Sequence, residues 1–258
     1  MSRRFTAAIF EHNTVVTICF FIVSICTFSA KAIEIKVVTE YLKPYQIKKD
    51  DNTLGGFSTE VIHALFELTG DKPNIKVMPW ARTYHTVMNS QNMMVYSLAR
   101  TKLREPLFKW VGKLHREQLY VWGLKSKFSR PFTTLDELKP FSFATSRGSN
   151  PEQYLTRHDF TKLYRLGNVE RNIQMLFSER VDFIISAEFP VKLRCKKMKF
   201  DCANLIKLFD IPELNSDLSV AFNLDTDPAI VERFQHAFIK LEKTGVVTAL
   251  RKKWSLPY

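Results

Sequence analysis

The sequence predicts an α/β protein of two lobes, each an open and mainly parallel sheet with flanking helices. The main observation is that short β-branched and aromatic runs alternate with amphipathic stretches of helical period, as in βαβ units. This alternation runs from Glu34 to about Leu98 and begins again at Leu119. The chain has 258 residues, of which 45% are hydrophobic, so it can supply one core or two.

Residues 1–32 have the pattern of a signal peptide. Two arginines precede an apolar run from Val15 to Phe28, and Ala30-Lys31-Ala32 has the small-x-small form of a signal-peptidase site. We therefore expect cleavage after Ala32 and export of the remainder. A retained membrane anchor is the alternative, but the apolar run is shorter than the roughly 20 residues that a spanning helix needs.

The charge balance is basic. Lys and Arg number 38 against 26 Asp and Glu, a net charge of +12, and removal of Arg3, Arg4, Lys31 and Glu11 with the leader lowers it to +10. Such a balance favours anionic partners. No basic run is interleaved with aromatic residues or glycines, so nucleic acid is not an expected partner. A positive field that attracts a small anion is the simpler interpretation.

Cysteine usage agrees with export. Only Cys195 and Cys202 follow the leader, and two thiols this close normally pair in an oxidising compartment. The sequence therefore predicts a local Cys195–Cys202 disulfide. A zinc site would need further Cys or His nearby, and the sequence has none there, so neither a metal nor a cofactor is expected.

The first series of elements is well marked. The expected elements are a strand at Glu34–Thr39, a helix from an N-cap at Ser58 to Gly70, a strand at Asn74–Met78, a helix from Trp80 to about Asn89, and a strand at Met93–Leu98. Phe57 and Ile62 occupy the two positions of a hydrophobic staple. The resulting βαβαβ order implies parallel strands whose carboxyl ends share one rim, where open sheets bind ligands.

The second series repeats the pattern. The expected strands are Leu119–Gly123, Phe141–Ala144, Leu163–Leu166, Val181–Ser186, Leu205–Ile211 and Leu218–Phe222, and the expected helices are Leu135–Leu138, one opening at Arg147–Glu152, Val169–Ser178, Ile230–Leu241 and Val246–Trp254. The opening at Arg147–Glu152 has an N-cap residue followed by proline. The two lobes are expected to face each other with their ligand-binding rims.

The stretch Met93 to Gly112 contains the strongest candidate site. A buried strand is followed by Thr101, where a helical turn is expected to begin, and Arg104 lies one turn further on. A helix N-terminus offers backbone donors and partial positive charge, and a guanidinium matches the two oxygens of a carboxylate. The pattern predicts a carboxylate receptor. A solvated arginine at a surface junction is the alternative.

Five segments, in the order GGFSTEV, SLARTKLREPLFKWVG, SRGSNPEQYL, SERVDFIISAE and TGVVTALRKKW, resemble the periplasmic substrate-binding proteins of solute-binding family 3. These proteins are receptors of polar amino-acid ABC uptake transporters. The resemblance covers the mature chain and implies the type II two-lobe fold, with 33–120 and 221–258 in the first lobe and 121–220 in the second. It implies crossover strands near Leu119–Gly123 and Leu218–Phe222 as a hinge.

The resemblance also implies a function. The expected protein is a monomer in the periplasm of a Gram-negative bacterium, which closes on a small polar ligand and delivers it to a membrane permease. The residues that the resemblance assigns to the ligand carboxylate are Ser97, Thr101 and Arg104 in the first lobe and Ser149 and Asn150 in the second. Ala99 stands where the family pattern has a second serine.

The position that usually pairs with the ligand's amino group departs from the pattern. The aspartate of many amino-acid receptors falls on Ala187, with Glu188 beside it. Either Glu188 replaces that aspartate or the ligand has no ammonium group there. Trp80 falls where the family presents an apolar wall, with burial in the core as the alternative, and Tyr41 is a candidate to cap the ligand.

Two other functions remain open. Some proteins of this fold are periplasmic dehydratases of cyclic carboxylates, in which a pocket acid protonates the leaving hydroxyl, and Glu188 is the candidate acid here. No Ser-His-Asp order, metal-ligand spacing or glycine-rich phosphate loop occurs, so binding without catalysis is the expectation. The same trap could also serve a membrane sensor.

Overall fold

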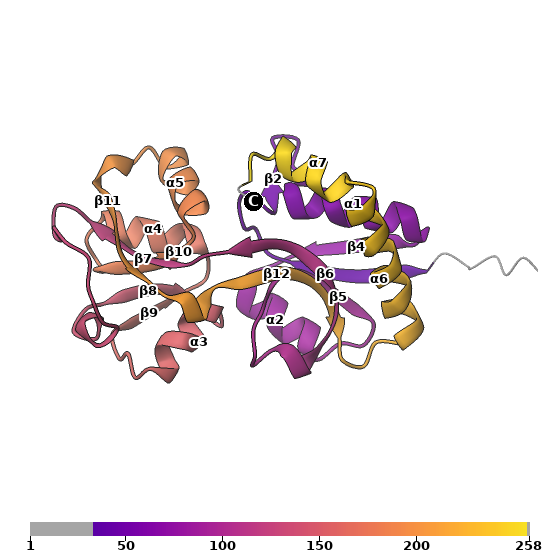
Figure 1. Ribbon diagram of the computed structural model, residues 1–258, viewed down its shortest axis with the longest axis horizontal. Helices are drawn as coiled ribbons and strands as arrows, with labels where there is room; N and C mark the ends of the chain where they lie inside the picture. The colour runs from indigo at the N-terminus through magenta and orange to yellow at the C-terminus, as the bar shows by residue number, and fades with distance from the viewer. Residues whose placement is uncertain (1–32, 257–258) are drawn as a thin grey trace, which may run out of the picture. The chain divides into compact units, whose positions relative to one another are not determined.

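A computed structural model describes residues 33–256 of the chain. The predicted signal peptide lies outside the described residues. The described part contains two five-stranded sheets with flanking helices, and each sheet forms the centre of one lobe (Figure 1). None of its helices combines the length and the apolar composition needed to cross a membrane.

The first lobe is built on a sheet with the strand order β4-β1-β5-β12-β6. Its strands are β1 (Glu34–Thr39), β4 (Lys72–Val77), β5 (Met93–Arg100), β6 (Phe108–Glu117) and β12 (Ser216–Asn223), and its helices are α1 (Phe57–Thr69), α2 (Trp80–Met88), α6 (Pro228–Lys243) and α7 (Val246–Lys253). A short hairpin, β2 (Ile47–Lys48) and β3 (Leu54–Gly55), precedes α1. β1 is parallel to β4 and β5, whereas β12 is antiparallel to β5 and β6.

Each face of this sheet packs against helices. Phe57 and Leu65 of α1 share a core with Phe234 and Phe238 of α6, whereas Trp80 of α2 belongs to a second core on the opposite face. Figure 1 shows α2 on one side of the sheet and α1, α6 and α7 on the other. Burial of these apolar faces is the main force that holds the lobe together.

The second lobe has the strand order β11-β7-β10-β8-β9. Its strands are β7 (Tyr120–Leu124), β8 (Phe143–Ser146), β9 (Leu163–Leu166), β10 (Phe183–Ser186) and β11 (Leu205–Asp210), and its helices are α3 (Asn150–Arg157), α4 (Val169–Phe177) and α5 (Glu188–Lys197). β8 is parallel to β9 and β10, while β7 is antiparallel to β10 and β11. The chain enters this lobe between Glu117 and Tyr120 and leaves it between Asp210 and Ser216, close to the predicted crossovers.

Several local predictions were wrong. The residue that precedes α1 is Gly56, not Ser58. Only glycine fits at position 56, because φ is 105° there and an added Cβ would collide with the backbone carbonyl of Tyr45. Thr101 begins a turn that leads only into the short 3₁₀-helix Glu105–Leu107 and then into β6. The predicted helix at Leu135–Leu138 is likewise a 3₁₀-helix, Asp136–Leu138. Neither β6 nor α5 was predicted at all.

The predicted disulfide is confirmed. Cys195, in the last turns of α5, is bonded to Cys202, with Cα atoms 5.8 Å apart. The bond connects α5 to the segment that leads into β11. Because Cys195 is fully buried, it also adds to the core between α4, α5 and the sheet.

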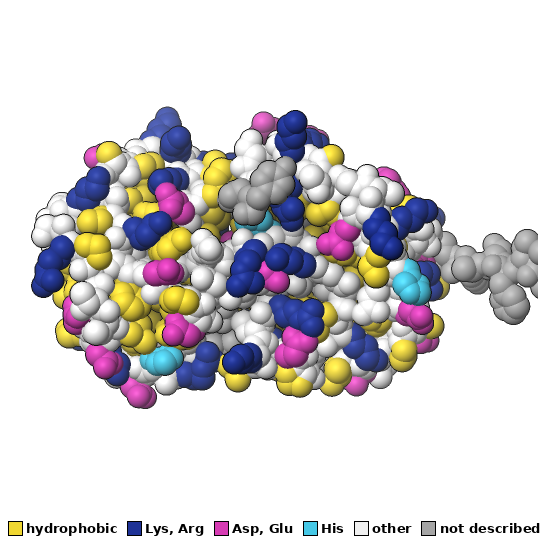
Figure 2. All heavy atoms as spheres, in the orientation of Figure 1, with side chains coloured by type: hydrophobic (Ala, Val, Ile, Leu, Met, Phe, Trp, Pro, Cys, Tyr) yellow, Lys and Arg dark blue, Asp and Glu magenta, His cyan; other side chains and the backbone are white. Residues whose placement is uncertain are grey.

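Basic side chains are dispersed over the visible face of the molecule. Figure 2 shows Lys and Arg among acidic and apolar side chains on both lobes. Some of the cations of the described chain have acidic partners, as in the ion pairs Lys253–Glu60 and Arg233–Asp71. The basic side chains on this face are therefore spread out rather than gathered into one patch.

Candidate functional site

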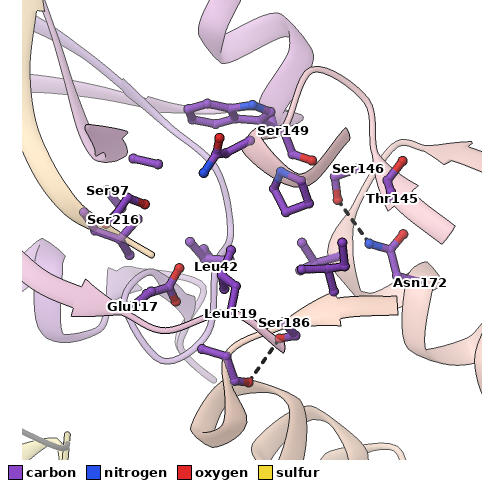
Figure 3. Close-up of a pocket in the computed structure, with 18 of the residues that line it drawn as sticks. Leu42, Ser97, Glu117, Leu119, Thr145, Ser146, Ser149, Asn172, Ser186 and Ser216 are labelled. Atoms are coloured by element: carbon purple, nitrogen blue, oxygen red, sulfur yellow. Dashed lines mark hydrogen bonds between the residues drawn. The ribbon is translucent and has the colours of Figure 1, made fainter. Parts of the chain in front are cut away.

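A cavity of about 120 Å³ is lined by residues of both lobes. In Figure 3 the labelled residues Ser97, Ser216 and Glu117 lie on one side of the cavity, and Thr145, Ser146, Ser149 and Asn172 lie on the other. Among the lining residues, Glu117 and Ser146 end β6 and β8, and Glu40 and Ala187 directly follow β1 and β10. The cavity therefore lies at strand ends, where ligands of open α/β sheets bind.

Ser97 has an unusual backbone conformation within β5. Its φ is 58°, in the left-handed region that serine rarely adopts. The pairing of β5 with β12 shifts its register at this point of β5. Its hydroxyl donates to Ser58 Oγ at 2.9 Å and accepts from Gln46 Nε2 at 2.6 Å. Such a conformation costs about 1 to 3 kcal/mol and is often found at binding sites. Ser97 lines the cavity.

Arg104 is the most deeply buried cation in the cavity wall, with only 2% of its surface exposed. Its guanidinium is 5.5 Å from the Trp80 ring and 5.0 Å from the Tyr84 ring. It donates to the Ala99 carbonyl at 3.3 Å, and among the described residues its Nε has no hydrogen-bond partner. Desolvation lowers the pKa of this guanidinium below its usual value. It is a buried cation without a carboxylate partner in the described chain.

The two lobes contact each other beside Arg104. Trp80 Nε1 donates to the Gly148 carbonyl at 2.9 Å, and Arg104 Nη2 donates to the same carbonyl at 3.3 Å. Arg104 Nη2 also reaches Gln153 Oε1 at 3.4 Å. The first lobe thus donates hydrogen bonds to uncharged oxygen atoms at and near the start of α3 in the second lobe.

The second-lobe wall presents polar atoms with unused hydrogen-bonding capacity. Ser149 caps α3 by accepting from the Glu152 backbone N–H at 3.3 Å. Asn150 Nδ2, Thr145 Oγ1 and Asn172 Oδ1 are buried and have no partner among the described residues. Buried polar atoms normally have partners, so these three atoms indicate a site that is completed by a bound molecule or water.

Two buried carboxyl groups, those of Glu40 and Glu117, lie on the first-lobe side of the cavity. Glu40 follows β1, and burial raises the pKa of its carboxyl to about 8. Glu117 ends β6, and burial also raises its pKa, against the effect of the 3.0 Å hydrogen bond that its Oε1 accepts from Tyr45. Arg194, from α5 of the second lobe, lies at the same end of the cavity and lowers the pKa of both carboxyls.

The structure brings five of the eight predicted ligand-binding residues into the cavity wall. These are Trp80, Ser97, Arg104, Ser149 and Asn150. Thr101 and Tyr41 lie outside the lining, and Tyr41 is 41% exposed. Ligand binding by all eight residues stays a prediction.

Glu188 also lies outside this cavity, where it lines a neighbouring one. Its carboxylate forms ion pairs with Lys192 and with Lys207, the latter at 2.8 Å. These two lysines lower the pKa of Glu188 to about 2. An acid that is ionised at neutral pH is a poor proton donor to a leaving hydroxyl, so Glu188 does not fit the dehydratase role.

Three charged residues of the cavity were not predicted. Glu40 follows the first strand directly, and this position could have indicated the rim. Glu117 belongs to a strand whose glycine and charged residues obscure any alternation. Arg194 stands next to Cys195 in a basic stretch that resembles a solvated surface, and no signal in the sequence marks it as buried.

Comparison with known proteins rests on structure. The sequence matches no protein-family model and no characterised protein at a significant level. The chain is similar to a histidine kinase sensor domain with similarity to periplasmic binding proteins, with a TM-score of 0.76, 17% identity, and coverage of 87% of this chain and 96% of that one.

Two solved binding proteins are also similar. One is the substrate-binding protein of an amino acid ABC transporter, with a TM-score of 0.72, 19% identity, and coverage of 86% of this chain and 99% of that one. The other is the arginine-, lysine-, histidine-binding protein ArtJ from Geobacillus stearothermophilus, with a TM-score of 0.73, 13% identity, and coverage of 86% and 94%. These similarities confirm the predicted two-lobe fold of type II periplasmic binding proteins.

Proposed function

We propose that this protein is a periplasmic receptor that captures a small carboxylate-bearing molecule between its lobes and delivers it to the permease of an ABC transporter. The observation that carries the proposal is Arg104, a cation with 2% exposure in the wall of a cavity between two lobes. A charge held away from water is costly unless it gains a partner of opposite sign. A ligand carboxylate would supply that partner.

The surrounding residues suit this role. Trp80 and Tyr84 stand beside the guanidinium and restrict its orientation. From the opposite lobe, Asn150 and Thr145 offer buried polar atoms without partners in the described chain. A carboxylate between the lobes would contact both, and this shared contact would favour the closed arrangement over an open one. The solved receptor of an amino acid ABC transporter with the same fold supports this assignment.

The test is to identify the molecule that the protein carries. The exported protein is purified without denaturant, exchanged into volatile buffer, and denatured, and the released compounds are identified by mass spectrometry. We expect a small carboxylate in stoichiometric amount. Incubation of that compound with fresh protein should return it unchanged, because the proposal is binding without catalysis. A released compound without any acidic group would contradict the proposal, and turnover would favour an enzyme.

A ligand-sensing module is the second candidate. Similarity to the sensor domain of a histidine kinase, with a TM-score of 0.76, favours it. Sensing and transport require the same capture step and differ only in the partner that reads the closed form. Co-purification with a permease or with a membrane kinase would distinguish these two roles.

A further inference from the structure

The cavity contains a second buried cation that the carboxylate site at Arg104 does not use. Arg194 of α5 has 5% of its surface exposed and lines the same cavity from the other lobe. Its hydrogen bonds are long and go to neutral oxygens: Nη1 donates to Ser186 Oγ at 3.4 Å and Nη2 to the Lys43 carbonyl at 3.5 Å. Its Nε is buried with no partner in the described part of the chain.

The acidic groups near Arg194 do not pair with it directly. Glu40, Glu117 and Glu170 act on it electrostatically, as does Tyr45, yet none forms an ion pair with it in the described structure. Glu117 instead accepts the hydroxyl of Tyr45 at 3.0 Å. Glu40, with a pKa of about 8, is mostly protonated at neutral pH and can donate a hydrogen bond. The Arg194 guanidinium therefore still has N–H donors that could bind an anion.

On the basis of the proposed function, we propose that the ligand is a short dicarboxylate, with one carboxylate at Arg104 of the first lobe and the other at Arg194 of the second. Both guanidinium groups present planar donors that match carboxylate geometry. Both cations line the same cavity of about 120 Å³, so one small molecule could contact both. A molecule that joins a cation of each lobe would also link ligand charge to lobe closure.

Ala187 contributes a methyl group to the cavity wall and offers nothing to an ammonium group of the ligand, whereas Glu40 and Glu117 of the same wall could pair with one. Dicarboxylates with and without an amino group share the two-carboxylate chemistry. The test therefore includes both kinds.

The experiment compares each diacid with its monoamide, which has nearly the same size but one carboxylate fewer. Protein freed of bound molecules by dialysis is titrated calorimetrically with L-glutamate and L-glutamine, L-aspartate and L-asparagine, glutarate and glutaramate, and succinate and succinamate. At least one diacid should bind about tenfold or more tightly than its amide, since a buried charge pair is lost in the amide. Whether the tightest diacid carries an amino group shows whether the natural ligand is an amino acid or a dicarboxylate without an amino group.

Variants then assign the preference to one side chain. Arg194→Gln should reduce the ratio of diacid to amide affinity to about threefold or less. Lys196→Gln, an exposed position on the same helix, removes the same charge and should leave the ratio unchanged. A purely structural Arg194 would weaken both ligands equally. Should Arg194→Gln fail to fold, the wild-type ratios still decide.

The outcomes separate this inference from the proposed function. Amides that bind as tightly as diacids, or an Arg194→Gln protein that keeps the preference, would overturn the dicarboxylate inference while the carboxylate receptor stands. If no member of the series binds, the inference fails, and an acid-free compound released from the native protein would show that the proposed function fails as well.

Discussion

Arg104 should contribute more to ligand affinity than any other side chain of the first lobe. Replacing it by alanine in the closed cavity would leave a desolvated carboxylate without its cation. Truncating one partner of a buried charge pair costs roughly 2 to 5 kcal/mol, or roughly 30- to 5,000-fold in affinity. Arg104→Lys should recover only part of this, because lysine keeps the charge but not the two-pronged geometry.

The same residue should contribute little to the stability of the ligand-free protein. Its guanidinium is desolvated, and its hydrogen-bond acceptors among residues 33–256 are neutral oxygens at 3.3 to 3.4 Å. A charge that is held away from water without an opposite charge is costly, so an apolar residue of similar volume should be tolerated at this position. Arg104→Met should therefore unfold in urea within about 1 kcal/mol of wild type, yet bind the ligand poorly.

The assay is calorimetric titration of each variant with the compound released from the native protein. Arg82→Ala is the matched control, because Arg82 is exposed on α2 and does not line the cavity. It should bind like wild type. An Arg104→Ala protein that folds normally and binds within about threefold of wild type, less than 1 kcal/mol, would refute the carboxylate role of Arg104.

Three further predictions concern stability. Replacing both Cys195 and Cys202 by serine should lower the free energy of unfolding by about 2 kcal/mol, since the bond closes a short loop; urea titration checks this, and alkylation of native, unreduced protein should add no mass. Gly112→Ala should destabilise by roughly 1 to 3 kcal/mol, because its Cβ would lie 2.1 Å from a buried phenylalanine ring on α6, whereas Gly167→Ala, with open space around it, should be neutral. Glu40 has a folded-state pKa of about 8 against 4.5, so its contribution is present below pH 4.5 and is lost as the pH rises to 8; Glu40→Gln should flatten the fall in stability between pH 5 and pH 8, and an unchanged slope would contradict this.

Much of the fold could be predicted because its strands and helices have clear local signals. The strand Glu34–Thr39 and the strand Leu163–Leu166 were predicted with the bounds that the structure has. Both are short runs bounded by turn residues. β6, in contrast, pairs along one whole side of β12 yet includes Gly112 and several charged residues. Its strand conformation follows from pairing with a distant segment, which a local pattern does not contain.

The residues of the candidate site likewise differ in how far the sequence predicts them. Arg104 could be found from the sequence because it follows a buried strand at a fixed spacing, although the helix N-terminus expected at Thr101 is not there. The turn still orients the chain, since Thr101 Oγ1 accepts the Arg104 backbone N–H at 3.3 Å. Burial of the guanidinium, by contrast, depends on Trp80 and on the second lobe, which meet it only in the folded protein.

The charges at the far end of the cavity show why specificity is harder to predict than fold. Glu40, Glu117 and Arg194 come from the first strand's end, from the crossover and from a helix of the other lobe. Each has an ordinary sequence neighbourhood, and their pKa values shift only because folding removes them together from water. A ligand that brings negative charge to Arg194 would also favour the protonated form of Glu40. Binding of a dianion near pH 8 should therefore take up protons, and titration in buffers of different ionisation enthalpy would measure that uptake. Equal heats in all buffers would show that Glu40 does not respond to the ligand.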